Sequence, residues 1–146
     1  MTHKLKPSAR LVWTPDLLLS FDKVKTAIAD AALLSYAKEN VPLALVCDAS
    51  DRAVGSVLEQ CVDHVWQPIA FFSRILHTHE KTWSAYDKEL LAVYLSVKNF
   101  KHHLEGRPFR IYTDHKPLVD SISKQTEAQN PRQQRQLAYI LSLIHI

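Results

Sequence analysis

The sequence lacks a cysteine framework, a long hydrophobic run and a strong net charge. Its two cysteines, Cys47 and Cys61, have neither the spacing of metal ligands nor the number that a disulfide scaffold needs. If the strands that carry them form a hairpin turning near 52–53, Cys47 faces Leu58 and not Cys61, so we expect both thiols to be reduced. No apolar run reaches transmembrane length, and residues 1–10 lack the apolar core of a signal peptide. These absences predict an intracellular protein without a membrane partner.

Charge and composition exclude a polycationic nucleic-acid binder and indicate one globular domain. The net charge is +3, from 18 lysines and arginines against 15 acids, which is only mildly basic. A content of 47% hydrophobic and 23% charged residues is typical of a soluble globular protein. A chain of 146 residues is long enough to bury one sizeable core.

The most informative stretch is 43–51, which reads L-A-L-V-C-D-A-S-D. Five consecutive apolar residues without alternation predict a strand with both faces covered. Asp48 ends this strand, at the position where open α/β sheets place their active sites. Asp48 is therefore a candidate metal ligand or acid–base group. Taken alone, however, an acid followed by Ser50 and Asp51 favours a simple turn.

The segments on either side of this stretch predict a helix and a meander. Apolar residues at helical spacing indicate one helix over roughly 16–30, followed by a connector ending at Pro42. After Asp48, the extended runs 54–60 and 65–73 are joined by tight turns and predict two antiparallel strands. Pro68 lies in the second run and cannot donate a ladder hydrogen bond, so we expect that strand at the sheet edge.

The longest predicted helix covers 79–105. An unbroken apolar stripe runs along it at helical spacing: Tyr86, Leu90, Val93, Val97, Phe100 and Leu104. Glu89 borders this stripe, so we expect its side chain beside the buried face. Gly106 follows as a helix stop.

A second acid-terminated strand follows the long helix. Residues 109–113 predict a strand that ends on Asp114, and a crossover through a helix makes it parallel to the strand at 43–47. After it, 116–122 predicts a short helix, and the polar, glutamine-rich 124–136 indicates a connector. The apolar residues 137–146 then remain at the end of the chain with nothing to cover them.

Three acids can be assembled from these elements. Asp48 and Asp114 end adjacent parallel strands, and strand parity places each on one defined face of the sheet. If the long helix covers that common face, Glu89 meets both. Three carboxylates in one place repel one another unless cations neutralise them. Oxygen ligands without histidine or cysteine favour Mg²⁺ or Mn²⁺ over zinc, and two such ions suit a phosphodiester displacement.

Four blocks of sequence carry a resemblance to a known family. In order they are V-C-D-A-S-D, P-I-A-F-F-S-R, W-S-A-Y-D-K-E-L-L-A-V and F-R-I-Y-T-D-H-K-P-L. Together they resemble the ribonuclease H domain of reverse transcriptases from Ty3/gypsy-type LTR retrotransposons, over about residues 12–140. Four blocks in one order are much more specific than any single motif.

The resemblance implies an α/β, RNase H-like fold: a five-stranded mixed sheet, with three antiparallel and then parallel strands, flanked by helices. It implies a metal-dependent endonuclease that cleaves the RNA strand of RNA–DNA hybrids. The catalytic and metal-binding residues would be Asp48, Glu89 and Asp114, with Mg²⁺ or Mn²⁺ in a two-ion site. The reverse transcriptase polymerase, an RNA-directed DNA polymerase, would lie in the same polyprotein, found in the cytoplasm, a virus-like particle or the nucleus.

The resemblance also sets expectations for domain boundaries. Residues 1–40 would be a linker and helix from the polymerase connection region, and 41–146 an RNase H-like domain. The family continues into a fifth strand and a fourth acid, so we expect the domain to be truncated at its C-terminus. Retention of three mutually repelling acids favours an enzyme. The competing hypothesis is a degenerate, non-catalytic module that binds nucleic acid or braces the polymerase.

Five further residues are candidates for contacts with the hybrid: Ser50, Ser73, Arg74, His115 and Lys116. Each lies within one of the four blocks, near the end of a predicted strand. A hydroxyl or cation in such a position can contact a phosphate. Solvated turns and strand ends explain His115 and Arg74 more simply.

Overall fold

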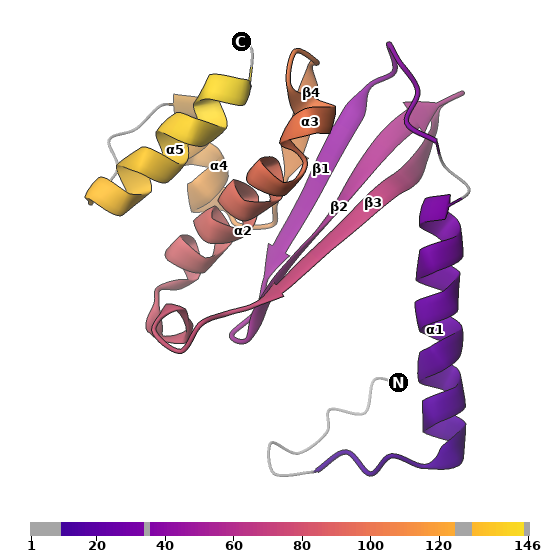
Figure 1. Cartoon of the computed structure of the whole chain (residues 1–146). Coiled ribbons are helices and arrows are strands. Elements are labelled where there is room, and N and C mark those ends of the chain that lie inside the picture. Colours follow the sequence, from indigo (N-terminus) through magenta and orange to yellow (C-terminus); the bar gives the residue numbers. More distant parts are fainter. Residues whose placement is uncertain (1–9, 34–35, 125–129, 145–146) are drawn as a thin grey trace.

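The computed structural model describes residues 10–33, 36–124 and 130–144. Within these residues, four strands form one mixed sheet in the order β3–β2–β1–β4 (Figure 1). The strands are β1 (Leu43–Ala49), β2 (Ala53–Val62), β3 (Val65–Ile75) and β4 (Phe109–Tyr112). β1 pairs antiparallel with β2 and parallel with β4. The predicted meander, the parallel fourth strand and the edge position of the proline-containing strand are confirmed.

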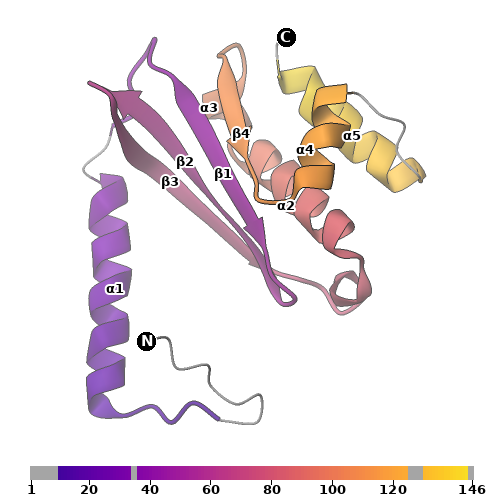
Figure 2. The same ribbon diagram turned by 180° about the vertical axis from the view of Figure 1, so that it is seen from behind.

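Helices flank the sheet unequally (Figures 1 and 2). They are α1 (Pro15–Leu33), the 3₁₀ turn η1 (Glu80–Thr82), α2 (Ala85–Asn99), α3 (Lys101–Leu104), α4 (Lys116–Lys124) and α5 (Pro131–Leu143). α2 packs on β1 and β2 and contacts α5 and α4, whereas α1 stands beside β3. None of the helices in the described ranges is long and apolar enough to cross a membrane.

The core lies between the sheet and α2. Leu43, Leu45 and Cys47 alternate along β1 and are buried together with α2 residues such as Leu90 and Val93. α2 therefore covers the face that carries these three strand residues. The intervening residues, including Asp48, point to the opposite face. The condition on which the sequence brought the three acids together, that the long helix covers the face of Asp48, is therefore not met. Both faces of an unbroken apolar strand are apolar, so the sequence could not show which face the helix covers.

The turn between β1 and β2 is centred one residue earlier than expected. Cys47 pairs with Ser56, and Leu58 faces Leu45. In an antiparallel pair, moving the turn by one residue moves the register by two. The expected pairing of Cys47 with Leu58 was wrong for this reason, but both cysteines are free, as predicted.

The helix predicted over 79–105 is divided into three pieces. Ser84 is extended, with φ −60° and ψ 159°, and its hydroxyl accepts a hydrogen bond from the Asp87 amide as the cap of α2. Phe100, with φ −97° and ψ 14°, separates α2 from α3. Gly106 follows with φ 73°, a left-handed conformation that suits glycine. A continuous apolar stripe therefore did not imply a continuous helix.

The C-terminal region is more ordered than predicted. Within the expected connector 124–136, α5 begins at Pro131, and the Asn130 side chain accepts from the Gln133 amide at 2.9 Å. Asparagine followed by proline is a cap and first-turn signal that was not recognised. The apolar tail expected to lie uncovered supplies Leu137, Ile140 and Leu143 to the core. Residues 125–129 and 145–146 lie outside the described residues.

Candidate active site

Three carboxylates from three elements meet at one end of the sheet. Asp48 is near the end of β1, Asp114 follows β4, and Glu89 lies in the first half of α2. One carboxylate oxygen from each can be chosen so that all three lie within 4.8 Å of one another. Asp48 and Asp114 are exposed, while Glu89 is only 7% exposed. The predicted convergence of the three acids is therefore present.

The convergence is achieved at the strand ends and not beneath the helix. A depression of about 410 Å³ is lined by the last residues of both parallel strands: Val46, Cys47, Asp48, Tyr112, Thr113 and Asp114. Asp48 and Asp114 line it, while Glu89 approaches from α2, which covers the other face. The acids thus form a cluster at the carboxyl ends of β1 and β4, where Asp48 and Asp114 are exposed to solvent.

The electrostatics of Glu89 show how closely the acids crowd. Burial raises the pKa of Glu89, and the charges of Asp114 and Asp48 raise it further. Two hydrogen bonds oppose the rise: the Ala49 amide donates to the carboxylate, and the Thr113 hydroxyl donates to Oε2 at 3.5 Å. An all-oxygen donor set with unneutralised repulsion fits a hard divalent cation, which would favour the ionised form of all three acids.

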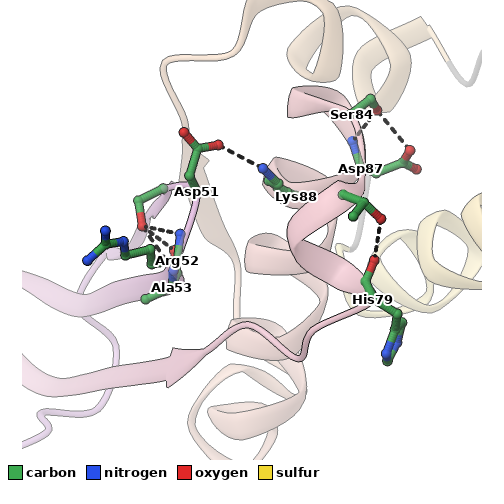
Figure 3. Close-up of polar contacts among 9 residues, drawn as sticks. Asp51, Arg52, Ala53, His79, Ser84, Asp87 and Lys88 are labelled. Carbon is green, nitrogen blue, oxygen red and sulfur yellow. Dashed lines mark hydrogen bonds and ion pairs between the residues drawn. The ribbon is translucent and has the colours of Figure 1, made fainter. Parts of the chain in front are cut away.

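Three consecutive side chains of α2 reach three different parts of the fold. Asp87 accepts from Arg132 at 2.7 Å and from Gln133 at 2.9 Å, both at the start of α5. Lys88 donates to Asp51 in the β1–β2 turn at 2.8 Å (Figure 3). Glu89 joins the carboxylate cluster. The N-terminal half of α2 is therefore held to α5 through Asp87 and to the β1–β2 turn through Lys88.

The β1–β2 turn is held together by Ser50. Its hydroxyl oxygen accepts from the amide of Ala53 at 2.9 Å and of Arg52 at 3.2 Å, and the hydroxyl donates to the Ala53 carbonyl at 3.0 Å. This is the simple turn that the sequence favoured around Asp48, but it coexists with the acid cluster. Ser50 is engaged within the turn, which fixes the chain just beyond Asp48.

The two β3 candidates lie across the sheet from the acids. Ser73 pairs with Gly55, which in turn pairs with Asp48, so the three residues form one row on one face. Arg74 donates two hydrogen bonds of 2.9 Å to Glu80. Arg74 is therefore committed to an ion pair with a buried acid and is not a solvated strand end.

The two α4 candidates begin that helix. The Leu118 amide donates to Nδ1 of His115 at 3.3 Å, so His115 caps α4. Its ring also meets Tyr86 edge-on, with centroids 5.9 Å apart. Lys116, the first residue of α4, is exposed. The structure thus places both beside Asp114, with His115 serving a structural contact as well.

Sequence reasoning missed the residues that support the acids. Thr113, Lys88 and Asp51 each contact the site or its frame, yet none was predicted to do so: Asp51 was expected only in a turn, and Lys88 was expected on the solvent face, whereas it is 7% exposed. Thr113 lies directly before Asp114, and strand parity places it on the face that α2 covers. This position could have predicted its contact with Glu89. The Lys88–Asp51 pair joins residues 37 positions apart, and no local pattern predicts it.

Comparison with known proteins defines the class. Residues 38–143 match the family model described as the RNase H-like domain found in reverse transcriptase. The chain belongs to this family. It is 33% identical over 135 residues to the Transposon Tf2-3 polyprotein of Schizosaccharomyces pombe, an alignment that covers 90% of this chain and 10% of the polyprotein. The Ty3/gypsy resemblance is therefore confirmed, and the chain spans about a tenth of that relative.

Solved structures share the fold. The foamy viral protease–reverse transcriptase dRH in complex with double-stranded DNA has a TM-score of 0.70 at 17% identity, covering 91% of this chain and 25% of that one. The same viral protein in complex with an RNA/DNA hybrid has a TM-score of 0.56 at 17% identity, covering 88% and 18%. RNase H1 of Halobacterium salinarum has a TM-score of 0.55 at 14% identity, covering 70% and 76%. The predicted α/β, RNase H-like fold is confirmed.

Proposed function

We propose that this chain is the ribonuclease H of a retrotransposon reverse transcriptase and cleaves the RNA strand of RNA–DNA hybrids. The observation that carries the proposal is the meeting of Asp48, Glu89 and Asp114 within 4.8 Å. Membership of the RNase H-like family supports the proposal. The repulsion among three carboxylates supports it as well, because bound cations would neutralise that repulsion. The solved complex of the foamy viral relative with an RNA/DNA hybrid supports the substrate class.

The three acids would hold Mg²⁺ or Mn²⁺ in a two-ion site. When bound, such ions neutralise charge developing on the phosphate and orient the attacking and leaving oxygens. Asp48 and Asp114 extend from paired strand ends, so the sheet fixes the distance between their backbones. Glu89 comes from a helix anchored by neighbouring side chains and is kept ionisable by the Ala49 amide. These residues supply ligands with fixed positions and little reorganisation.

The open face of the sheet would receive the hybrid. Asp48, Gly55 and Ser73 form a row across three strands, and Gly55 adds no side chain to block it. Ser73 is exposed, roughly 10 Å from Asp48 at two strand spacings. Its hydroxyl would contact a backbone phosphate of the hybrid. His115 and Lys116 directly follow Asp114 and would contact the hybrid beside it. Ser50 and Arg74 would act indirectly, Ser50 by holding the β1–β2 turn and Arg74 by its ion pair with Glu80.

The N-terminal helix would join the domain to its polymerase. The family model begins at residue 38, after α1. α1 presents apolar side chains to solvent along its length: Leu17, Leu18, Phe21, Val24 and Ile28 are each more than 40% exposed. An apolar face of this kind marks an interaction surface. We assign residues 1–40 to the link with the polymerase in the same polyprotein.

A cleavage assay on a labelled RNA–DNA hybrid tests the activity. We expect Mg²⁺- or Mn²⁺-dependent cutting of the RNA strand, abolished by Asp48→Asn and by Glu89→Gln. Asp22→Asn, which removes an exposed acid of α1 that pairs with Lys25, is the matched control and should cut normally. Cleavage by the wild-type chain that survives Asp48→Asn would overturn the proposed site. Hybrid binding without cleavage would instead identify the non-catalytic module.

A further inference from the structure

One ion pair beside the acids combines a buried cation with an exposed acid. Lys88 and Asp51 lie 2.8 Å apart, with 9% and 95% of their side chains exposed. Most surface ion pairs contribute little to stability, and burying an ammonium is unfavourable unless a partner compensates it. The Lys88 side chain is largely buried, yet its partner is an exposed acid in a turn. We therefore look for a role of this pair other than stabilising the fold.

The pair joins the two segments that carry Asp48 and Glu89, namely the end of β1 and the first half of α2. In the sequence, Asp51 follows Asp48 by three residues and Lys88 directly precedes Glu89. Figure 3 shows the contact between Lys88 and Asp51. Within the cluster, carboxylate oxygens of Asp48 and Glu89 lie within 4.8 Å of each other, so the two ionised groups repel. The Lys88–Asp51 contact is attractive and spans the same gap. It opposes the separation of the strand end from the helix.

We propose that Lys88 is a positioning residue for the divalent-cation site. By holding Asp51, it fixes the β1–β2 turn against α2 and sets the spacing between Asp48 and Glu89. This inference rests on the proposed metal site but adds a residue that contacts neither metal nor substrate. Outer partners that orient ligands in this way typically change metal affinity by one to two orders of magnitude when removed.

The sign of the effect separates positioning from simple charge. If Lys88 acted only through its charge, removing this cation from beside three acids would tighten the binding of a divalent ion. If Lys88 acts by position, its removal lets the turn move away and weakens binding, by roughly tenfold. Lys88→Met keeps the length of the buried stem, so it removes the charge with little change in packing.

Mn²⁺ titration of residues 1–146, followed by the electron paramagnetic resonance signal of the free ion, measures the affinity. We expect Lys88→Met and Asp51→Asn each to bind several-fold to tenfold more weakly than wild type. The double variant should be no weaker than the weaker single variant, because one contact has been removed. Lys88→Arg should retain most of the affinity. Lys25→Met, which breaks a pair of the same 2.8 Å length on α1, should change nothing.

The outcomes distinguish the two proposals. If Asp48→Asn binds Mn²⁺ as well as wild type, the metal site itself is wrong. If Asp48→Asn loses binding while Lys88→Met binds equally or more tightly, the site stands and the positioning role is refuted. Thermal melting without metal checks the fold of each variant. Should Lys88→Met fail to fold, Lys88→Gln decides the question, because it also removes the cation and the contact, so charge and position again predict opposite changes in affinity.

Discussion

The guanidinium of Arg132 stacks over the ring of Trp83, with its central carbon 3.6 Å from the ring centroid. The same guanidinium donates to Asp87 at 2.7 Å. One side chain of α5 thus binds both the residue before the α2 cap and the first turn of α2. This contact fixes the first turn of α2, where Asp87 lies two residues before Glu89, to α5.

Replacing Arg132 with lysine should destabilise the protein by roughly 1–3 kcal/mol, because lysine has no planar group to stack while it also donates to an acid. Urea denaturation of the metal-free chain measures the difference. Arg135→Lys, at an exposed position of the same helix, is the control and should stay within about 0.5 kcal/mol of wild type. Equal losses in the two variants would show that the stacking contributes nothing specific.

Divalent metal should stabilise the fold through the acid cluster. At ten times its dissociation constant, Mg²⁺ would add about 1.4 kcal/mol to the free energy of unfolding by mass action. We expect thermal melting to show this gain in wild type and not in Asp48→Asn. Without metal, Asp48→Asn should be as stable as wild type or more so, because one repulsion is relieved. An identical Mg²⁺ response in both proteins would contradict a site at Asp48.

The raised pKa of Glu89 predicts a pH dependence of metal-free stability. Its folded-state pKa lies above the ordinary value of 4.5, so the folded protein binds this proton more readily than the unfolded chain. The associated stability is present below pH 4.5 and is lost as the pH rises through the folded-state pKa. Glu89→Gln should remove that loss.

The measurement is melting temperature against pH in the presence of a chelator. Asp51, Glu80 and Asp87 have lowered pKa values and contribute the opposite slope, so only the difference between wild type and Glu89→Gln isolates Glu89. Replacing the chelator with Mg²⁺ should diminish or reverse this difference in slope, because a bound cation favours the ionised form of Glu89. A constant difference across the pH range would refute the assigned shift.

Cys47 should be unreactive although it lies beside the site. Burial raises the pKa of its thiol to about 12, so almost no thiolate forms at neutral pH. Cys61 is only half-buried and should react first with a thiol reagent. Single-cysteine variants, Cys61→Ser and Cys47→Ala, allow each rate to be measured. Rapid labelling of Cys47 in the folded Cys61→Ser protein would mean that the end of β1 opens frequently.

Local sequence patterns predicted most of the sheet and the candidate acids. The apolar run 43–47 is followed by Asp48, and the shorter run 109–113 is followed by Asp114. In both cases the neighbouring residues alone predict where the strand is buried and where it ends. Because a helix lies between the two strands in the sequence, we expected them to pair in parallel, and β4 does pair in parallel with β1. The catalytic roles of the acids stay predictions, as does the boundary near residue 40.

Contacts between distant segments were decided only by the tertiary structure. Whether α2 covers the face of Cys47 or of Asp48 was ambiguous, because an apolar strand offers both faces equally. The break at Phe100 and the docking of α5 depend on packing partners elsewhere in the chain. The Lys88–Asp51 pair, which spans 37 residues, forms because folding brings a turn and a helix together. Periodicity records which residues are buried along one element; it carries no information about which element buries them.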